Sequence, residues 1–249
     1  MPDILPGAEP ASYPGGPNGA LVLHGFTGCP QSMRGLAEAF AAKGFTTELP
    51  LLPGHGTSLD DMKATGWADW STAAEAAYAE LALRTEKVVV AGLSMGGTLT
   101  AWLASKHPEI VGIVLVNPAA EPAGDAFVDI LRRTIDQGVE FMPPVGNDVA
   151  ADGVEELAYD GIPTASLLTL VEAQRDLDAG LPEIRCPVLL FTSKQDHVVA
   201  PSNSDYLASR VRGPVERVFL DRSYHVATID LEKDDIFQGA VDFATKVTA

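Results

Sequence analysis

The sequence predicts a single α/β domain of 249 residues in which helices flank a mainly parallel central sheet. Short unbroken apolar runs recur along the chain, as expected of strands buried on both faces. Segments with apolar residues at helical spacing separate these runs, and this alternation is typical of a parallel sheet covered on both sides. One apolar run stops abruptly at a serine flanked by glycines, which indicates a sharp turn from strand to helix.

Composition and charge exclude several functional classes. The chain is 46% hydrophobic, enough to bury a large core as one domain over residues 1–249. The formal net charge of −17, from 34 acidic and 17 basic residues, argues against nucleic acid as a partner and against adhesion to anionic lipid. No stretch approaches the roughly 18 apolar residues of a membrane span, so stable membrane insertion is not expected.

The cysteines and the first residues of the chain predict a cytoplasmic protein. Cys29 and Cys186 are too few and too far apart for a disulfide framework or a zinc site, and we expect both to be free. The first residues lack the basic segment and apolar run of a secretory signal.

The first third of the chain alternates as this fold class requires. Residues 1–19 are rich in proline and glycine and are expected to form an extended lead-in over the surface. Regular elements then follow one another: a strand at Ala20–His24, a helix from about Gln31 to Gly44, a strand at Phe45–Leu49, a loop at Pro53–Gly56 and a helix at Trp70–Leu81.

The rest of the chain continues the alternation, apart from one long insertion. Its predicted elements are a strand at Val88–Val90, a helix that carries Leu99, Trp102 and Leu103 on one face, strands at Gly112–Val116, Pro187–Thr192 and Glu216–Leu220, and a last helix at Ile236–Val247.

The insertion lies at about 121–182. No strand is evident in it, and it offers helical patterns at Phe127–Ile135, Val154–Tyr159 and Ser166–Leu177. Loops at the carboxyl ends of parallel strands surround the ligand site in α/β proteins, so we expect this segment to form a small helical cap over that site. Its apolar residues are candidates for lining an acyl pocket or for ordinary packing.

The glycine-flanked serine, Ser94, is a candidate nucleophile. It lies in Gly92–Gly97, whose glycines permit the strained backbone that points a serine outward. A buried strand precedes it and a helical pattern follows it, which is the setting of a Gly-x-Ser-x-Gly elbow. The alternative, a glycine-rich surface turn with a solvated serine, is disfavoured by that setting.

A serine hydroxyl needs a base to remove its proton and an acid to orient that base. Asp196 stands just past the predicted strand Pro187–Thr192, and His225 follows the predicted strand Glu216–Leu220 by a short loop. Both therefore lie at the sheet edge where parallel strands end. The chain order Ser94, Asp196, His225 is also the triad order of α/β-hydrolases and differs from two other well-known protease orders.

Other residues offer weaker assignments. Asp221 lies near His225 in the sequence and is the alternative acid. Cys29 has no separate histidine and acid, so we interpret it as a small loop residue rather than a second nucleophile. The other four histidines are less suited to be the base. His197 adjoins the acid, and His107 ends a helix. His24 and His55 lie in loops, where their rings are expected to bond to backbone groups.

Two hydrogen-bond donors must also await the oxyanion that forms during attack on an ester. The elbow supplies one as the backbone N–H of Met95, directly after the nucleophile. The loop after the first strand of the sheet predicts the other as the N–H of Phe26, within His24–Gly28.

Taken together, these motifs resemble the bacterial carboxylesterase and monoacylglycerol lipase group of the α/β-hydrolase superfamily. The resemblance covers nearly the whole chain after residue 19 and is carried by His24–Gly28, Pro53–Gly56, Gly92–Gly97, Asp196–Val199 and Ser223–Thr228. In the insertion, Glu156–Leu168 is similar to the cap of thermostable bacterial monoacylglycerol lipases more than to that of short-chain carboxylesterases.

The resemblance implies an α/β-hydrolase fold and a serine hydrolase that cleaves carboxylic esters through an acyl-enzyme, without metal or organic cofactor. Ser94, Asp196 and His225 would form the triad, and the amides of Phe26 and Met95 the oxyanion hole. We expect monoacylglycerols as substrates. A short-chain carboxylesterase or a thioesterase is the alternative within the class, and a hydrolase-fold receptor for a small ligand is the alternative outside it.

The resemblance also points to Glu156 as the residue that binds the alcohol half of the substrate. Glu155 and Glu156 are adjacent, and on a helix their side chains would point about 100° apart, so that one faces inward and the other faces water. A carboxylate over the leaving-group pocket would accept hydrogen bonds from glycerol hydroxyls. An ordinary solvated glutamate is the alternative for Glu156.

Overall fold

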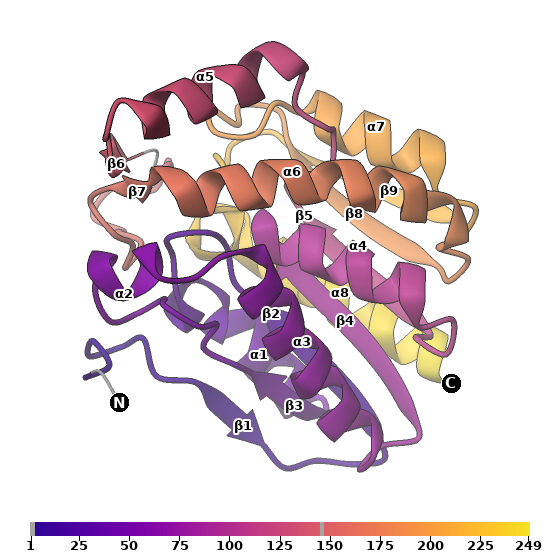
Figure 1. Cartoon of the computed structure of the whole chain (residues 1–249). Coiled ribbons are helices and arrows are strands. Elements are labelled where there is room, and N and C mark those ends of the chain that lie inside the picture. The colour runs from indigo at the N-terminus through magenta and orange to yellow at the C-terminus, as the bar shows by residue number, and fades with distance from the viewer. Residues whose placement is uncertain (1–2, 145–146) are drawn as a thin grey trace.

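The computed structural model describes residues 3–144 and 147–249; residues 1–2 of the predicted lead-in and 145–146 of the predicted cap lie outside it. Within the described residues, the central sheet has seven strands in the order β1-β3-β2-β4-β5-β8-β9 (Figure 1). All neighbouring strands are parallel except β1 and β3, which confirms the predicted sheet. The strands are β1 (Ala11–Tyr13), β2 (Asn18–Leu23), β3 (Thr46–Leu49), β4 (Lys87–Leu93), β5 (Gly112–Val116), β8 (Val188–Ser193) and β9 (Val215–Leu220).

Side chains of the central strands fill two apolar clusters, one on each face of the sheet. Val88 and Val90 belong to one cluster and Val89 and Ala91 to the other, because successive residues of a strand point to opposite faces. Residues of α3, α4 and α7 pack on the first face, and residues of α1 and α8 on the second. These helices are α1 (Arg34–Ala42), α3 (Trp67–Ala82), α4 (Met95–Lys106), α7 (Ser202–Arg210) and α8 (Lys233–Thr248).

In the described residues, the long insertion between β5 and β8 includes the α-helices α5 (Asp125–Asp136) and α6 (Thr164–Gly180). Val128 and Leu131 of α5 pack on Val171 of α6, and the two helices lie together across the upper part of Figure 1. Both were predicted from their apolar spacing. Leu170 and Leu177 of α6 also join the sheet cluster, so this helix connects the insertion to the core.

Two predictions for the insertion are wrong. The first is the absence of strands: β6 (Phe141–Met142) pairs with β7 (Ile162–Pro163) in a small antiparallel ribbon. Strands of two residues are too short to show an alternating pattern in the sequence.

The second is the helix at Val154–Tyr159, where the chain is irregular. Much of its backbone bonds to distant side chains instead of to its own next turn. The side chain of Gln31 accepts a hydrogen bond from the N–H of Leu157 and donates one to the carbonyl oxygen of Glu155. These hydrogen bonds hold the segment against the main domain in an irregular conformation instead of a helix.

Smaller elements complete the fold. The predicted lead-in contains β1, paired antiparallel with β3, and a short helix α2 (Leu59–Lys63) begins after Ser58, whose side chain accepts the N–H of Asp61. Neither was predicted, and nor was α7. Short 3-10 helices lie at Pro30–Met33, Leu181–Glu183 and Ala227–Ile229. Among the described residues, no helix is both long and apolar enough to cross a lipid bilayer.

Candidate active site

Ser94 occupies a strained turn between β4 and α4. Its backbone has φ 55° and ψ −118°, a left-handed conformation that side-chain-bearing residues rarely adopt. The turn also packs too closely for side chains at its glycines: a Cβ on Gly92 would meet the carbonyl oxygen of Gly96, and a Cβ on Gly96 would meet that of Leu23. The predicted elbow is therefore present, and the glycines around Ser94 are required by contact as well as by conformation.

Asp196 and His225 form a buried acid–base pair beyond the ends of β8 and β9. His225 Nδ1 lies 2.7 Å from Asp196 Oδ2, and the two side chains are only 8% and 2% exposed. Asp196 Oδ1 accepts the backbone N–H groups of Val198 at 2.9 Å and Val199 at 2.8 Å. The carboxylate is thereby fixed, and a proton on Nδ1 directed at it leaves Nε2 as the basic atom of the ring.

Ser94 and His225 face one cavity of about 240 Å³. Within the described part of the chain, no hydrogen bond joins the Ser94 hydroxyl to the His225 ring. In unliganded hydrolases this bond is often long and tightens only when substrate binds. The structure thus brings the three predicted triad residues to one site, with the acid–base pair formed and the serine beside it.

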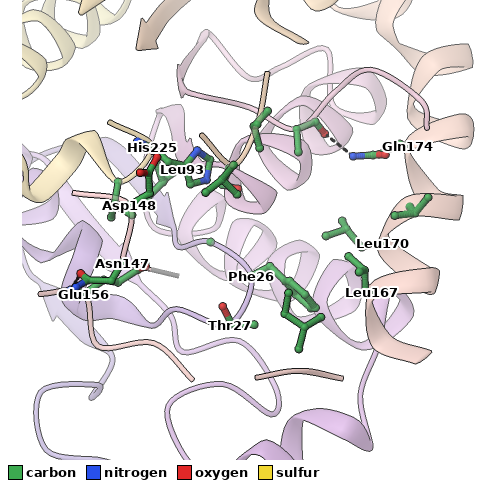
Figure 2. Close-up of a pocket in the computed structure, with 18 of the residues that line it drawn as sticks. Phe26, Thr27, Leu93, Asn147, Asp148, Glu156, Leu167, Leu170, Gln174 and His225 are labelled. Carbon is green, nitrogen blue, oxygen red and sulfur yellow. Dashed lines mark hydrogen bonds between the residues drawn. The ribbon is translucent and has the colours of Figure 1, made fainter. Parts of the chain in front are cut away.

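The cavity is mostly apolar, with a group of polar residues on the side of His225 and Gln174 on the side of Leu170 (Figure 2). Asn147, Asp148 and Glu156 lie towards His225, whereas Leu167 and Leu170 of α6 lie on the opposite side. The cavity thus offers an apolar wall for an acyl chain and polar groups for an alcohol. Its apolar lining residues include Phe26, Leu93, Phe127, Ile162, Leu167, Leu170, Val171 and Val199.

The predicted oxyanion donors lie on the two loops that meet at Ser94. Gly25 brings the loop after β2 against the elbow, since a Cβ there would stand 3.5 Å from the Cβ of Ser94. Phe26 follows in this loop, and Met95 begins α4. Across residues 3–144 and 147–249, neither amide N–H of Phe26 or Met95 donates a hydrogen bond to a protein group. Both N–H groups are free to bind an oxyanion.

Glu156 points into the cavity, and Glu155 is exposed. The Glu156 carboxylate lies beside Gly28, where a Cβ would stand 2.6 Å from Oε1, so the absence of a side chain at Gly28 makes room for it. Its backbone N–H donates to Asn147 Oδ1 at 2.8 Å. Burial raises the pKa of Glu156 above its ordinary value, and the nearby His225 opposes this rise. Glu156 and Glu155 thus face inward and outward, as predicted, although the segment that carries them is irregular and not a helix.

The alternative acid and nucleophile lie away from this chemistry. Asp221 is largely exposed and forms an ion pair with Lys194 at 2.6 Å. Cys29 is buried, its Sγ lies 3.3 Å from the carbonyl oxygen of Leu157, and burial raises the pKa of its thiol to about 11. A thiol held in its neutral form is a poor nucleophile.

The other histidines have structural partners, as expected. His24 Nδ1 lies 2.9 Å from the carbonyl oxygen of Gly25, and its Nε2 accepts the N–H of Leu52. Burial lowers the pKa of His24 to about 4 and that of His55 to about 3, so both rings stay neutral near pH 7. His107 lies between two surface glutamates, and His197 contacts Asp148.

Asn117, which was not predicted from the sequence, holds the main chain of His225 through its side chain. It follows β5 with φ 45°, and its Nδ2 donates to the carbonyl oxygen of His225 at 2.8 Å and to Ser193 Oγ at 2.9 Å. Its Oδ1 accepts the N–H of Ser193 at 2.8 Å. A polar residue directly after a buried parallel strand was the available signal, because that position lies at the same sheet edge as Asp196.

Glu232 fastens the loop that leads from β9 to His225. Its carboxylate accepts the backbone N–H groups of Asp221 at 3.1 Å, Arg222 at 2.9 Å and Ser223 at 2.8 Å. Burial opposes ionisation, but these hydrogen bonds outweigh it, so the pKa of Glu232 lies below its ordinary value of 4.5.

We expect Glu232→Gln to lower the free energy of unfolding by about 1–3 kcal/mol near pH 7, since three N–H groups lose a charged acceptor. A lowered pKa means that ionised Glu232 stabilises the fold above about pH 4.5 and that this stabilisation is lost as the pH falls below that value. Urea unfolding at pH 7 and pH 4 should therefore show a smaller difference between variant and wild type at pH 4. An equal difference at both values would contradict this role.

The described residues contain no group of three or more His, Cys, Asp or Glu side chains placed to hold a metal ion. A strained serine, a histidine oriented by a buried carboxylate and two free amides are the parts that nucleophilic acyl transfer requires.

Comparison with known proteins places this site in context. Residues 17–232 match the family described as serine aminopeptidase, S33. The chain is 42% identical over 247 residues to a thermostable monoacylglycerol lipase of Bacillus sp. (strain H-257), covering 98% of this chain and 96% of the relative. It is 24% identical over 242 residues to a carboxylesterase of Bacillus subtilis (strain 168), with 96% and 97% covered.

Solved structures agree with the fold. A chain described among the metagenome-derived lipolytic enzymes LipS and LipT superposes with a TM-score of 0.93 at 39% identity, covering 98% of this chain and all of the other. The monoacylglycerol lipase of Paleococcus ferrophilus superposes with a TM-score of 0.80 over 96% and 98% of the two chains, and at 18% identity this likeness supports the fold alone.

Proposed function

Because this chain belongs to the serine aminopeptidase S33 family, within the α/β-hydrolase superfamily, we infer that it is a serine hydrolase of carboxylic esters. The observation that carries the ester-cleaving activity is the alignment at 42% identity with a monoacylglycerol lipase over nearly the whole chain. The site geometry agrees with this activity. We propose Ser94 as the nucleophile, His225 as the base and Asp196 as the acid that orients it.

In the proposed mechanism, Ser94 Oγ attacks the ester carbonyl carbon while His225 Nε2 takes the hydroxyl proton. The carbonyl oxygen becomes negatively charged, and the amides of Phe26 and Met95 donate hydrogen bonds to it. The bond between the carbonyl carbon and the alcohol oxygen then breaks while His225 gives its proton to that oxygen. The alcohol leaves, and the acyl group remains on Ser94 Oγ as the acyl-enzyme. Water repeats the sequence, with His225 again as the base, and releases the carboxylic acid.

The substrate we propose is a monoacylglycerol. The apolar wall of the cavity suits an acyl chain, and the carboxyl group of Glu156 near His225 suits a glycerol leaving group. A short-chain ester is the second candidate, and the similarity to a carboxylesterase supports ester cleavage of this kind without specifying the acyl chain. Both candidates share the acyl-enzyme and differ in acyl length and in the alcohol released.

A substrate panel that varies acyl length and alcohol independently tests this proposal. We expect kcat/KM to be higher for a monoacylglycerol than for the ethyl ester of the same fatty acid. Equal values with a preference for short acyl chains would indicate the carboxylesterase instead. Titration with a fluorophosphonate excludes the receptor alternative if labelling is rapid and stoichiometric and a chromogenic ester undergoes many turnovers; a single slow turnover would contradict the enzyme.

Glu156 is proposed to bind the glycerol hydroxyls. Its carboxyl group faces the cavity close to His225, where the alcohol must leave. A carboxyl oxygen can accept hydrogen bonds from glycerol hydroxyls, and loss of a hydrogen bond in a buried site costs about 1–3 kcal/mol. About 1.4 kcal/mol corresponds to a factor of ten.

We therefore expect Glu156→Gln to lower kcat/KM for a monoacylglycerol about tenfold relative to the matched ethyl ester. Glu155→Gln is the control, because it makes the same change at the exposed neighbour and should leave the ratio of the two esters as in wild type. An unchanged ratio in Glu156→Gln would remove Glu156 from substrate recognition.

We also propose a cytoplasmic location. Cys29 and Cys186 are both free thiols in the structure, which suits a reducing compartment. Fractionation of cells that express the protein from its own promoter tests this location.

A further inference from the structure

Three segments of the chain meet at the carboxylate of Asp148, which lies in the crossing segment 147–151 of the insertion. Asp148 Oδ1 lies 2.7 Å from His197 Nδ1. Its Oδ2 accepts the backbone N–H of His197 at 3.1 Å and that of His225 at 3.1 Å. His197 adjoins Asp196 in the loop after β8. The Asp148 side chain thus bonds both to the main chain of His197, next to Asp196, and to the main chain of His225.

Further bonds join the crossing segment to the histidine loop. The carbonyl oxygen of Asp148 accepts the N–H of Val226 at 3.1 Å. The buried carboxylate of Asp230 accepts the N–H groups of Ala150 and Ala151 at 2.9 Å each and that of Tyr224 at 2.8 Å. The crossing segment is therefore anchored on both sides of His225, although it belongs to the insertion in sequence.

The charge of Asp148 suits this arrangement. Burial works against its ionisation, but hydrogen bonds from the His197 ring and from the backbone N–H groups of His197 and His225 outweigh burial and lower the pKa of Asp148. Asp148 also lines the cavity that Ser94 and His225 face.

We propose that Asp148 is a positioning residue for ester hydrolysis, which sets the main chain of His225 relative to Asp196. Asp196 orients the imidazole at Nδ1, but the place of the ring also depends on its backbone. That backbone is fixed by the N–H bond to Asp148 and by the carbonyl bond from Asn117. Asp148 acts through His225 and does not itself contact the reacting atoms. The inference rests on the proposed role of His225 as the base.

The test compares Asp148→Asn with Asp152→Asn. In Asp148→Asn, the one remaining oxygen can accept the backbone N–H groups of His197 and His225 only as a neutral acceptor, and the NH₂ group faces His197 Nδ1. Hydrogen bonds to a neutral oxygen are about half as strong as those to a carboxylate, so the hold on the His225 main chain weakens. Displacement of a catalytic group by about 1 Å lowers the rate about 100-fold, so we expect kcat in Asp148→Asn to fall about 10- to 100-fold. The KM for the same ester should change less than about threefold, because the acyl and alcohol contacts remain. Asp152 is exposed and follows the crossing segment directly, so its variant should match wild type.

A proton resonance tests the positioning directly. The His225 Nδ1 proton, bonded to Asp196, should give a low-field signal in wild type and in Asp152→Asn, and this signal should move or broaden in Asp148→Asn. Asp148→Glu, which keeps two acceptor oxygens, should recover part of the lost kcat and also serves if Asp148→Asn fails to fold. Wild-type kcat and an unmoved resonance in Asp148→Asn, or no recovery in Asp148→Glu, would overturn the proposal.

Failure of this inference can be told from failure of the proposed function. If wild-type protein hydrolyses esters and reacts with a fluorophosphonate while Asp148→Asn behaves like Asp152→Asn, only the role of Asp148 is wrong. If wild-type protein neither hydrolyses esters nor reacts, the serine hydrolase itself is contradicted.

Discussion

Replacing Ser94 by alanine is expected to lower kcat for ester hydrolysis by about 10⁶, the loss typical of a triad nucleophile. Cys29, the alternative nucleophile, cannot replace the hydroxyl, because burial holds its thiol in the neutral form. The melting temperature should stay close to that of wild type, since alanine at φ 55° carries the same backbone strain as serine. A chromogenic ester assay and thermal unfolding measure the two quantities.

Two further variants separate chemistry from folding. Cys29→Ser should retain kcat within about twofold of wild type, because its thiol takes no part in acyl transfer. Ser94→Gly should be as inactive as Ser94→Ala but more stable by about 1 kcal/mol, since glycine relieves the left-handed strain. Ester hydrolysis above a few per cent of the wild-type rate in Ser94→Ala, with contaminating esterases excluded, would show that another residue is the nucleophile.

Local sequence patterns were sufficient where burial and spacing act within one element. Val88–Val90 predicted β4 because a strand buried on both faces is apolar throughout, and its two faces do fill separate clusters. The helix predicted at Val154–Tyr159 is wrong because hydrogen bonds of this segment go to the main domain, including the side chain of Gln31. A pairing over more than 100 residues leaves no trace in a local period.

The same distinction applies to the candidate site. Ser94, Asp196 and His225 could be placed from the sequence because each directly follows, or lies one short loop beyond, a recognisable strand. Asp148 could not, since it belongs to an irregular part of the insertion and gains its significance only through contacts with His197 and His225. An acidic residue in an irregular segment looks like ordinary solvated surface until the fold supplies its partners.

Exchange of the acid, Asp196→Asn, is expected to lower kcat by about 10⁴. The backbone N–H groups of Val198 and Val199 will hold the remaining amide oxygen where Asp196 Oδ1 now lies. The new NH₂ group then faces His225 Nδ1 and can only donate to it. Nδ1 must give up its proton, Nε2 carries it instead, and the ring can no longer accept the proton of Ser94.

Asp221→Asn is the matched control for this exchange, because it makes the same chemical change in the alternative acid. It removes only an exposed ion pair with Lys194, and exposed pairs contribute about 0–1 kcal/mol to stability. Its kcat should therefore equal that of wild type, and both variants should melt close to the wild-type temperature. A loss of kcat in Asp221→Asn together with wild-type kcat in Asp196→Asn would identify Asp221 as the acid. The 2.7 Å contact between Asp196 and His225 would then have only a structural role.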